Sequence, residues 1–376
     1  MLQLQPAQIN QKLTFIEQYL TAQNAADGSK MDANANVTQK NIATLEAEIM
    51  KDMFIQVNRA QVSKKITELF GEAMAHEYVR QIEEHEIYVH DETSLKPYCV
   101  SVTMYPFLLD GLTKLGGESK APKHIESFCG AFVNFVFAVS SQFAGAVATV
   151  EFLTYFDYFA RKDYGDNYLQ THTHEIANHL QHVVYAVNQP AAARGYQSVF
   201  WNISIYDQHY FNSMFGEFVF PDFTKPNWQT VQALQNFFLA WFNAERSKSI
   251  LTFPVVTVAM LTEQGRCKDQ NFANRMAQHL SEGSSFFVYL SDSADSLASC
   301  CRLRSEISDN TFSYSLGAGG VATGSINVIT INMNRLVQDG RDLKIEVEKI
   351  HKYQVAYRKL MEEYLAAGML TVYSAG

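Results

Sequence analysis

Short strand-like runs alternate with helical runs through the second half of the chain, and this alternation constrains the fold more than any other feature. The strand-like runs are residues 198–205, 252–260, 286–290 and 327–333, and the helical runs include 228–244 and 271–280. Parallel strands need a crossover connection, which is usually a helix, so this order is typical of a parallel sheet. The sequence therefore predicts an α/β architecture.

The first part of the chain is predicted to be mostly helical. Residues 1–50 have helical periodicity interrupted at 23–37, which predicts a peripheral helical cap, and residues 49–84 repeat apolar positions every three or four residues. Residues 86–90 alternate like a strand, and 128–159 predict one long buried helix. Further helices are predicted at 174–187 and 343–367. We therefore predict an N-terminal helical region at 1–85 and an α/β catalytic domain at 86–376.

Charge and hydrophobicity exclude several classes of function. The formal net charge is -9, which provides no basic surface for a nucleic-acid polymer but leaves room for a small nucleotide. The uncharged stretch 128–150 contains polar residues such as Asn134 and Gln142, so it suits a buried segment better than a membrane span. The N-terminus lacks a basic-then-apolar signal, so the cytoplasm is the expected location.

The five cysteines predict reduced thiols rather than a disulfide scaffold, because their number is odd and no secretion signal is present. Cys300 and Cys301 are adjacent and precede Arg302, whose positive charge would favour a reactive thiolate. The alternative is that each cysteine is a small apolar residue in the core. The residues alone leave both interpretations open for Cys301 and for Cys99.

Two patterns that resemble common sites have the wrong spacing. His174 and His179 are five residues apart, about 140° on a helix, whereas a zinc-protease helix needs ligands four residues apart. We therefore predict no metal site in this chain. The glycine-rich run 316–324 lacks the lysine of a phosphate-binding loop and leads into a strand, so it predicts a loop.

A set of segments, taken in order, resembles the class III (anaerobic) ribonucleoside-triphosphate reductases. Each segment alone is weak, but the ordered set is specific and spans most of the chain. The segments are HD (90–91), KPYCVSV (96–102), SFCG (127–130), SSQFAGAVA (140–148), NQPAAARGYQS (188–198), WNIS (201–204), CCRLR (300–304), TGS (323–325) and TINMNR (330–335).

The resemblance implies a fold and a reaction. The fold would be the ten-stranded α/β barrel of the glycyl-radical and ribonucleotide reductase type, with a finger loop near 295–305. The reaction would be the anaerobic reduction of ribonucleoside triphosphates to 2′-deoxyribonucleoside triphosphates for DNA synthesis. Cys301 would form a transient thiyl radical that takes the 3′-hydrogen of the ribose, and Cys99 would supply reducing equivalents. Cys300 would be a neighbour or a redox partner of Cys301. The implied substrate pocket contains Tyr98, Gln197, Asn202, Gly324, Ser325 and Asn332.

The resemblance also implies partners that act with this chain. The family carries its radical glycine and a zinc site in C-terminal motifs that do not occur in this sequence, so we expect the chain to need a C-terminal part for turnover. The strand-like run 369–373 leads us to expect a continuation. A homodimer is expected, with a deoxynucleoside triphosphate effector at its interface near Gln142 and Lys162.

The expected redox partners follow from the same resemblance. A radical S-adenosylmethionine iron–sulfur enzyme would generate the glycyl radical. Formate-oxidising members carry asparagines where this chain has Tyr98 and the pair Gly324 and Ser325. A thioredoxin-like or glutaredoxin-like reductant is therefore expected in place of formate.

Two other functions are compatible with parts of the sequence. One is a glycyl-radical lyase of the formate acetyltransferase type, which shares the barrel and can carry adjacent cysteines. The other is a truncated nucleotide-binding fragment without catalysis. The segments 194–204 and 323–335 fit the reductases better than the lyases.

Overall fold

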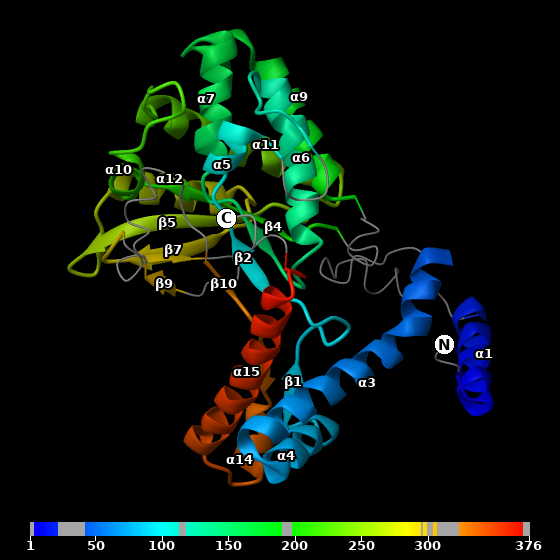
Figure 1. Cartoon of the computed structure of the whole chain (residues 1–376). Helices are drawn as coiled ribbons and strands as arrows, with labels where there is room; N and C mark the ends of the chain where they lie inside the picture. The colour runs from blue at the N-terminus through cyan, green and yellow to red at the C-terminus, as the bar shows by residue number, and fades with distance from the viewer. Residues whose placement is uncertain are drawn as a thin grey trace. The chain divides into compact units, whose positions relative to one another are not determined.

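The computed structural model describes residues 4–21, 42–112, 118–189, 198–294, 296–298, 304–306 and 323–370. The chain divides into two compact units, each formed by segments that are distant in sequence (Figure 1). The first unit comprises Met1–Tyr98, Pro190–Ser198 and Ser325–Leu370, and the second comprises Cys99–Gln189, Val199–Gly324 and Thr371–Gly376. The domain boundary predicted between residues 85 and 86 stays a prediction. The two units are defined by contacts in space, whereas the predicted domains are continuous stretches of the chain.

The first unit is helical apart from one pair of short strands. Its strands β1 (Ile87–Val89) and β11 (Ile329–Ile331) pair antiparallel, with Ile87 opposite Ile331. The predicted helical pair and the last predicted helix are confirmed. The helices are α1 (Pro6–Thr21), α3 (Ile42–Phe70), α4 (Glu72–Glu83), α14 (Met333–Gln338) and α15 (Leu343–Ala366).

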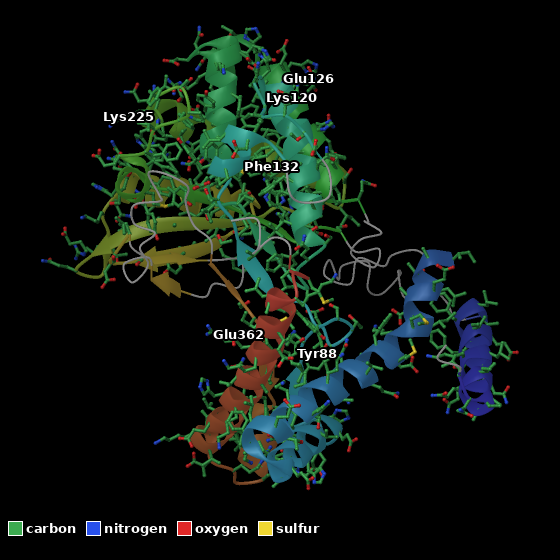
Figure 2. The ribbon with its side chains drawn as sticks, viewed as in Figure 1. Tyr88, Lys120, Glu126, Phe132, Lys225 and Glu362 are labelled. Carbon is green, nitrogen blue, oxygen red and sulfur yellow. The ribbon has the colours of Figure 1, made fainter. Side chains whose placement is uncertain are left out.

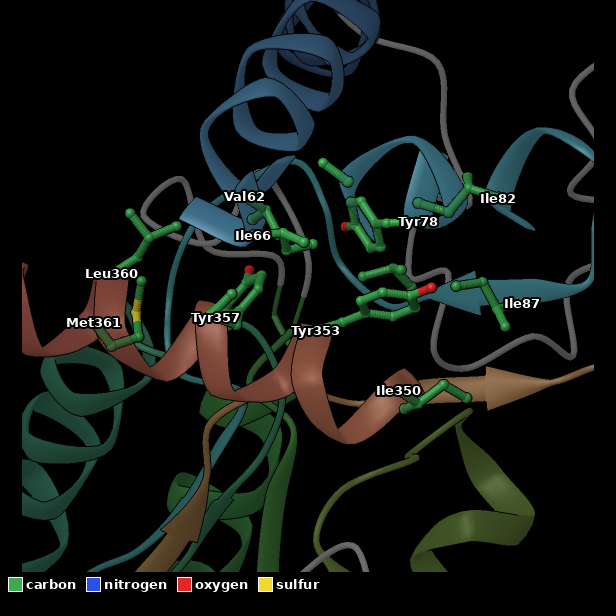
Figure 3. Close-up of a cluster of buried hydrophobic side chains, with 13 residues drawn as sticks. Val62, Ile66, Tyr78, Ile82, Ile87, Ile350, Tyr353, Tyr357, Leu360 and Met361 are labelled. Carbon is green, nitrogen blue, oxygen red and sulfur yellow. The ribbon is translucent and has the colours of Figure 1, made fainter. Parts of the chain in front are cut away.

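The core of the first unit joins α3 and α4 to α15. Figure 3 shows Tyr353 and Tyr357 on α15 pointing toward Ile66 of α3 and Tyr78 of α4. The rings of Tyr78 and Tyr353 meet edge to face with centroids 4.9 Å apart, an arrangement that aromatic pairs prefer. The Tyr353 hydroxyl donates a hydrogen bond of 2.7 Å to Oε1 of Gln81. The hydroxyl is therefore satisfied although the tyrosine is buried.

The buried carboxylate of Glu86 connects α4 to the segment before α15. Arg80 donates to Glu86 at 2.8 Å, and Arg341 also pairs with it. Burial opposes ionisation of Glu86, but the hydrogen bonds from Arg80 and the charge of Arg341 outweigh it, so its pKa lies below the ordinary value. A buried carboxylate thus stays charged because two guanidinium groups face it.

The second unit contains a mixed sheet whose central strands are parallel. In the part of the chain that the structure describes, this sheet has seven strands. Six of them follow the order β10, β2, β3, β4, β5 and β6, and the seventh, β7, pairs with β5. Strands β2, β3, β4, β5 and β7 are parallel and lie side by side in chain order. The strands are β2 (Cys99–Ser101), β3 (Val147–Ala148), β4 (Trp201–Tyr206), β5 (Val255–Glu263), β6 (Arg266–Cys267), β7 (Phe287–Ser291) and β10 (Thr323–Ser325).

Helices connect these strands, as the alternation in the sequence predicted. Helices α9, α11 and α12 confirm the predictions at 174–187, 228–244 and 271–280. Short helices α5, α8 and α10 were not predicted. The bounds are α5 (Tyr105–Asp110), α6 (Ile125–Ser140), α7 (Phe152–Tyr164), α8 (Tyr168–Thr171), α9 (Thr173–Val187), α10 (Gln208–Phe215), α11 (Trp228–Lys248) and α12 (Gln270–Ser281).

The predicted single helix over 128–159 is wrong. Helix α6 ends at Ser140 and α7 begins at Phe152, with the strand β3 between them. Strand β3 is flanked by β2 and β4 and is buried, so its apolar run has the same appearance in sequence as a buried helix. None of the helices in the described ranges is long and apolar enough to cross a membrane.

Aromatic side chains attach the helices to one face of this sheet. The ring of Trp201 on β4 lies 5.2 Å from Phe132 of α6 and 4.8 Å from Phe152 of α7, measured between centroids. Figure 2 labels Phe132 in the interior of the unit. The Trp201 indole N–H donates to Thr149 Oγ1 at 2.8 Å. One face of the sheet is therefore closed by helices.

Replacing Ile66 tests the core of the first unit. Ile66 is fully buried, so Ile66→Ala should lower the free energy of unfolding by roughly 2–5 kcal/mol through lost burial and a cavity. Leu69→Ala, on the same helix but 43% exposed, should change it by less than about 1 kcal/mol. Urea denaturation followed by circular dichroism measures both. Equal losses in the two variants would contradict this core.

Candidate active site

Cys99 lies on the sheet face that points away from the helices. It is buried in β2, and the backbone N–H of Ala146 donates to its Sγ at 3.3 Å. The register places Ser101 beside Ala148 and Ala148 beside Asn202. Side chains alternate between faces along a strand, so Cys99 and Ser101 share the face of Asn202, and Trp201 points the opposite way. The candidate thiol and the helical layer are thus on opposite faces.

The face that carries Cys99 is lined by small polar side chains. Ser101, Asn202, Ser204 and Thr257 are all buried on it, in register along β2, β4 and β5. The Nδ2 group of Asn202 donates to Thr257 Oγ1 at 3.3 Å. Among the described residues, the Oδ1 atom of Asn202 has no hydrogen-bond partner. Buried strands of a closed core are usually apolar on both faces, so this polar face is suited to a polar ligand.

Sequence reasoning identified Asn202 but missed Ser101, Ser204 and Thr257. The signal was present in β4, where Asn202 and Ser204 occupy alternate positions of an otherwise apolar and aromatic strand. A polar residue at every second position of a buried strand indicates a polar face. The register with β5, which adds Thr257, is a tertiary feature that the sequence does not give.

Gly324 on β10 lies against the backbone of Cys99. A Cβ atom at position 324 would be 2.3 Å from the Cys99 carbonyl oxygen, so only glycine fits there. In the first unit, the Tyr98 N–H donates to the Ser325 carbonyl oxygen at 2.8 Å. The Oγ atom of Ser325 is buried, and no described residue forms a hydrogen bond with it. Of the predicted pocket residues, the second unit thus brings Cys99, Asn202 and Gly324 together.

The other predicted site residues have different surroundings. Asn332 begins α14 in the first unit, where its Oδ1 accepts from the Arg335 N–H and its Nδ2 donates to the His85 carbonyl oxygen. Gln142 follows the end of α6, and the Lys162 ammonium lies 5.7 Å from the Tyr158 ring centroid. Their assigned roles stay predictions. Cys300, Cys301 and Gln197 lie outside the described residues.

Two short strands lie on either side of Cys301 in the sequence. Strands β8 (Ser296–Ala298) and β9 (Arg304–Glu306) pair antiparallel, with Ala298 opposite Arg304. The pairing joins the backbone on the two sides of residues 299–303. In the described ranges, no group of three or more histidine, cysteine, aspartate or glutamate side chains is placed to hold a metal ion.

A buried acid that the sequence did not reveal lies beyond the end of β3. Burial raises the pKa of Glu151 to about 7, although hydrogen bonds from the Met104 N–H and the Thr103 hydroxyl lower it. The Met104 N–H donates at 3.1 Å. Glu151 therefore links the start of α7 to the segment that follows β2. No spacing or motif around Glu151 marks it in the sequence.

A protein-family model described as anaerobic ribonucleoside-triphosphate reductase matches residues 46–376. The chain belongs to this family. Comparison with curated proteins found no match. The family assignment confirms the resemblance drawn from the ordered sequence segments.

Solved structures of this family have the same fold. One, an anaerobic ribonucleotide reductase, is 27% identical with a TM-score of 0.77, covering 98% of this chain and 58% of that chain. The anaerobic ribonucleotide reductase from Thermotoga maritima in complex with dATP and CTP is 25% identical with a TM-score of 0.78, covering 100% and 65%. The same Thermotoga maritima protein with glycerol in its active site is 26% identical with a TM-score of 0.78, covering 98% and 60%. This chain therefore spans less than two thirds of their length, and its α/β fold is that of part of the family's barrel.

Adding a methyl group at Gly324 tests the close approach to Cys99. Gly324→Ala should force β10 away from β2 and destabilise the fold by about 1–3 kcal/mol, because the clash is with backbone. Gly130→Ala in α6 is the control, since a Cβ there meets no atom within 4 Å and alanine favours helix. Thermal unfolding measures both. A Gly324→Ala variant as stable as Gly130→Ala would contradict the contact.

The raised pKa of Glu151 predicts a pH-dependent stability. Between pH 4.5 and about 7 the folded protein keeps a proton on Glu151 that the unfolded chain releases, so this group's contribution to stability falls as pH rises. Glu151→Gln cannot titrate. Its unfolding free energy relative to wild type should increase by up to about 3 kcal/mol between about pH 5 and about pH 8. Chemical denaturation at both pH values measures this, and a difference that does not change with pH would contradict the assignment.

Proposed function

We propose that this chain is the substrate-binding and thiol-bearing part of an anaerobic ribonucleoside-triphosphate reductase. It would reduce ribonucleoside triphosphates to 2′-deoxyribonucleoside triphosphates by thiyl-radical chemistry, in the cytoplasm and for DNA synthesis. The observation that carries the proposal is Cys99, a buried thiol on a polar sheet face, in a chain of the reductase family. A buried cysteine surrounded only by apolar side chains would have a packing role.

The proposal gives two cysteines different tasks. Cys301 would form the thiyl radical that takes the 3′-hydrogen of the ribose, after which the 2′-hydroxyl leaves as water. Cys99 would then supply a proton and an electron to the 2′ carbon, the external thiol reductant would supply the second proton and electron, and the 3′-hydrogen would return from Cys301, which becomes a thiyl radical again. The antiparallel pairing of β8 with β9 supports a finger loop near 295–305, because it brings Ala298 and Arg304 opposite one another. Cys300 would be the neighbour of Cys301.

Several groups would form the substrate pocket around Cys99. Asn202 and Gly324 are supported by their position on or beside the strand face of Cys99. Ser325, whose buried hydroxyl has no hydrogen-bond partner among the described residues, is a further proposed pocket residue. The pocket would also contain Tyr98, Gln197 and Asn332.

The proposed catalytic assembly needs components outside this sequence. A C-terminal part would carry the zinc site and a glycyl radical, and the radical would open the S–H bond of Cys301. A radical S-adenosylmethionine iron–sulfur enzyme would generate that radical. A thioredoxin-like or glutaredoxin-like protein would return the reducing equivalents.

Regulation by a deoxynucleotide is part of the same proposal. The Thermotoga maritima relative was solved in complex with dATP and CTP. We propose a homodimer of this chain in which a deoxynucleoside triphosphate effector binds near Gln142 and Lys162. The end of α6 and the helix α7 would then belong to the dimer interface.

The two alternative functions differ from the proposed one in their support and in the activity that they predict. A glycyl-radical lyase of the formate acetyltransferase type has less support, because the family model is that of the reductases. A non-catalytic nucleotide-binding fragment would bind ribonucleotides but never reduce them, even with the C-terminal part present.

Anaerobic turnover by cysteine variants tests the proposal. The chain would be co-expressed with the C-terminal part and the activating enzyme, and deoxynucleotide formation from the four ribonucleoside triphosphates measured. Wild type should form deoxynucleotides, whereas Cys99→Ser and Cys301→Ser should fall to background, because serine cannot supply the sulfur redox chemistry. Both variants should keep nucleotide binding.

Cys129→Ser is the matched control for the loss of a thiol. Cys129 is also buried, but it lies in α6 within the helical layer, and burial raises its pKa well above the ordinary value. Its substitution should leave turnover per folded molecule unchanged. Full activity in Cys99→Ser would exclude the proposed role of Cys99, and binding without turnover in wild type would favour the non-catalytic alternative.

A further inference from the structure

We infer that Thr257 is a positioning residue that orients the Asn202 amide, so that the two side chains together receive one hydroxyl group of the substrate's ribose. The inference rests on the proposed function, because it supposes that the face of Cys99 binds a ribonucleotide. It assigns a role to Thr257, which no sequence motif indicates.

The amide of Asn202 is only half satisfied. Asn202 has no exposed surface, and its Nδ2 group donates to Thr257 Oγ1 at 3.3 Å, while its Oδ1 atom has no partner in the part of the chain that the structure describes. An unpaired buried carbonyl oxygen is unfavourable, because it has lost its hydrogen bonds to water without gaining others. Such a group in a native protein is expected to meet a ligand or an ordered water.

The chemistry of the pair specifies the kind of group it can bind. Asn202 Oδ1 is an acceptor, and the hydroxyl hydrogen of Thr257 is a donor that remains available when Oγ1 accepts from Nδ2. A ligand hydroxyl matches both, since it donates to the amide oxygen and accepts from the threonine. A phosphate oxygen could not donate to Oδ1, and a carbonyl has no hydrogen to offer. The pair is therefore complementary to a hydroxyl.

The position of the pair fits a sugar beside Cys99. Asn202 is on β4 and Cys99 is on β2, with β3 between them, and both side chains point to the same face. Two strand spacings and an offset of two residues along the strand separate the thiol from the amide by roughly 12 Å, a separation that a bound nucleoside can span. Thr257 is on β5, the next strand beyond Asn202, so it holds the amide from the far side.

Binding by nucleotides that lack one hydroxyl tests the inference. Of the four ribonucleoside triphosphates, the one that wild type binds most tightly is radiolabelled, and its displacement by the same nucleotide and by its 2′-deoxy and 3′-deoxy forms is measured. Displacement of the labelled ribonucleotide reports only on the site that it occupies. Wild type should prefer the ribonucleotide to one of the two deoxy forms by about tenfold or more, because the deoxy form leaves the amide oxygen unpaired.

Two substitutions test whether the hydroxyl of Thr257, rather than the shape of its side chain, produces this preference. Thr257→Val has the same shape without the hydroxyl, and it should reduce that preference to less than about threefold while leaving affinity for the deoxy form unchanged. Thr257→Ser restores the hydroxyl and should restore the preference. A merely structural role would instead weaken all three nucleotides equally.

The outcomes distinguish this inference from the proposed function. If wild type binds ribonucleotides without preferring a hydroxyl, or if Thr257→Val keeps the full preference, the role of Thr257 is overturned and the proposed function stands. If wild type binds no ribonucleoside triphosphate, the proposed function fails and the inference fails with it. If an ordered water alone satisfies Asn202, the preference is absent in wild type, which is the first of these outcomes.

Discussion

The contact of Trp201 with Phe132 and Phe152 is the interaction on which the second unit depends. It fixes the apolar face of β4 against α6 and α7, and the indole N–H is satisfied by Thr149. Side chains along a strand alternate between the two faces of the sheet. Because Trp201 packs against the helices, Asn202 points to the other face. A shift of one residue in register would exchange the two, placing an amide among aromatic rings. The aromatic layer thereby determines where the polar face is.

The same constraint explains how a buried thiol comes to lie among polar side chains. Cys99 is covered, yet its neighbours on the face are Ser101 and Asn202, which can exchange hydrogen bonds with a ligand. Gly324 brings a further strand within contact of the Cys99 backbone. In the proposed reaction, a site enclosed in this way would exclude water and so protect a reactive radical from side reactions.

The first unit depends on a different kind of interaction, the packing of segments far apart in sequence. Tyr353 on α15 contacts Tyr78 and bonds to Gln81 on α4, and Arg341 reaches Glu86. Removing one partner of such a buried ion pair leaves an uncompensated charge, so the two ends of the sequence stabilise one another. This unit therefore cannot form from the N-terminal helices alone with the same core.

The sequence by itself determined the α/β class, most helices and the family, because periodicity and the ordered segments are local properties of the chain. It failed at 128–159, where the apolar run of β3 is indistinguishable from buried helix until β2 and β4 flank it. It also missed Thr257, which the register sets beside Ser204, diagonally across from Asn202 and within hydrogen-bond distance of its amide. The raised pKa of Glu151 could not be predicted from the sequence either, because burial in the folded protein causes it. These features depend on which segments pack together, and that is decided by tertiary structure because contacts between distant residues leave no periodic trace in the sequence.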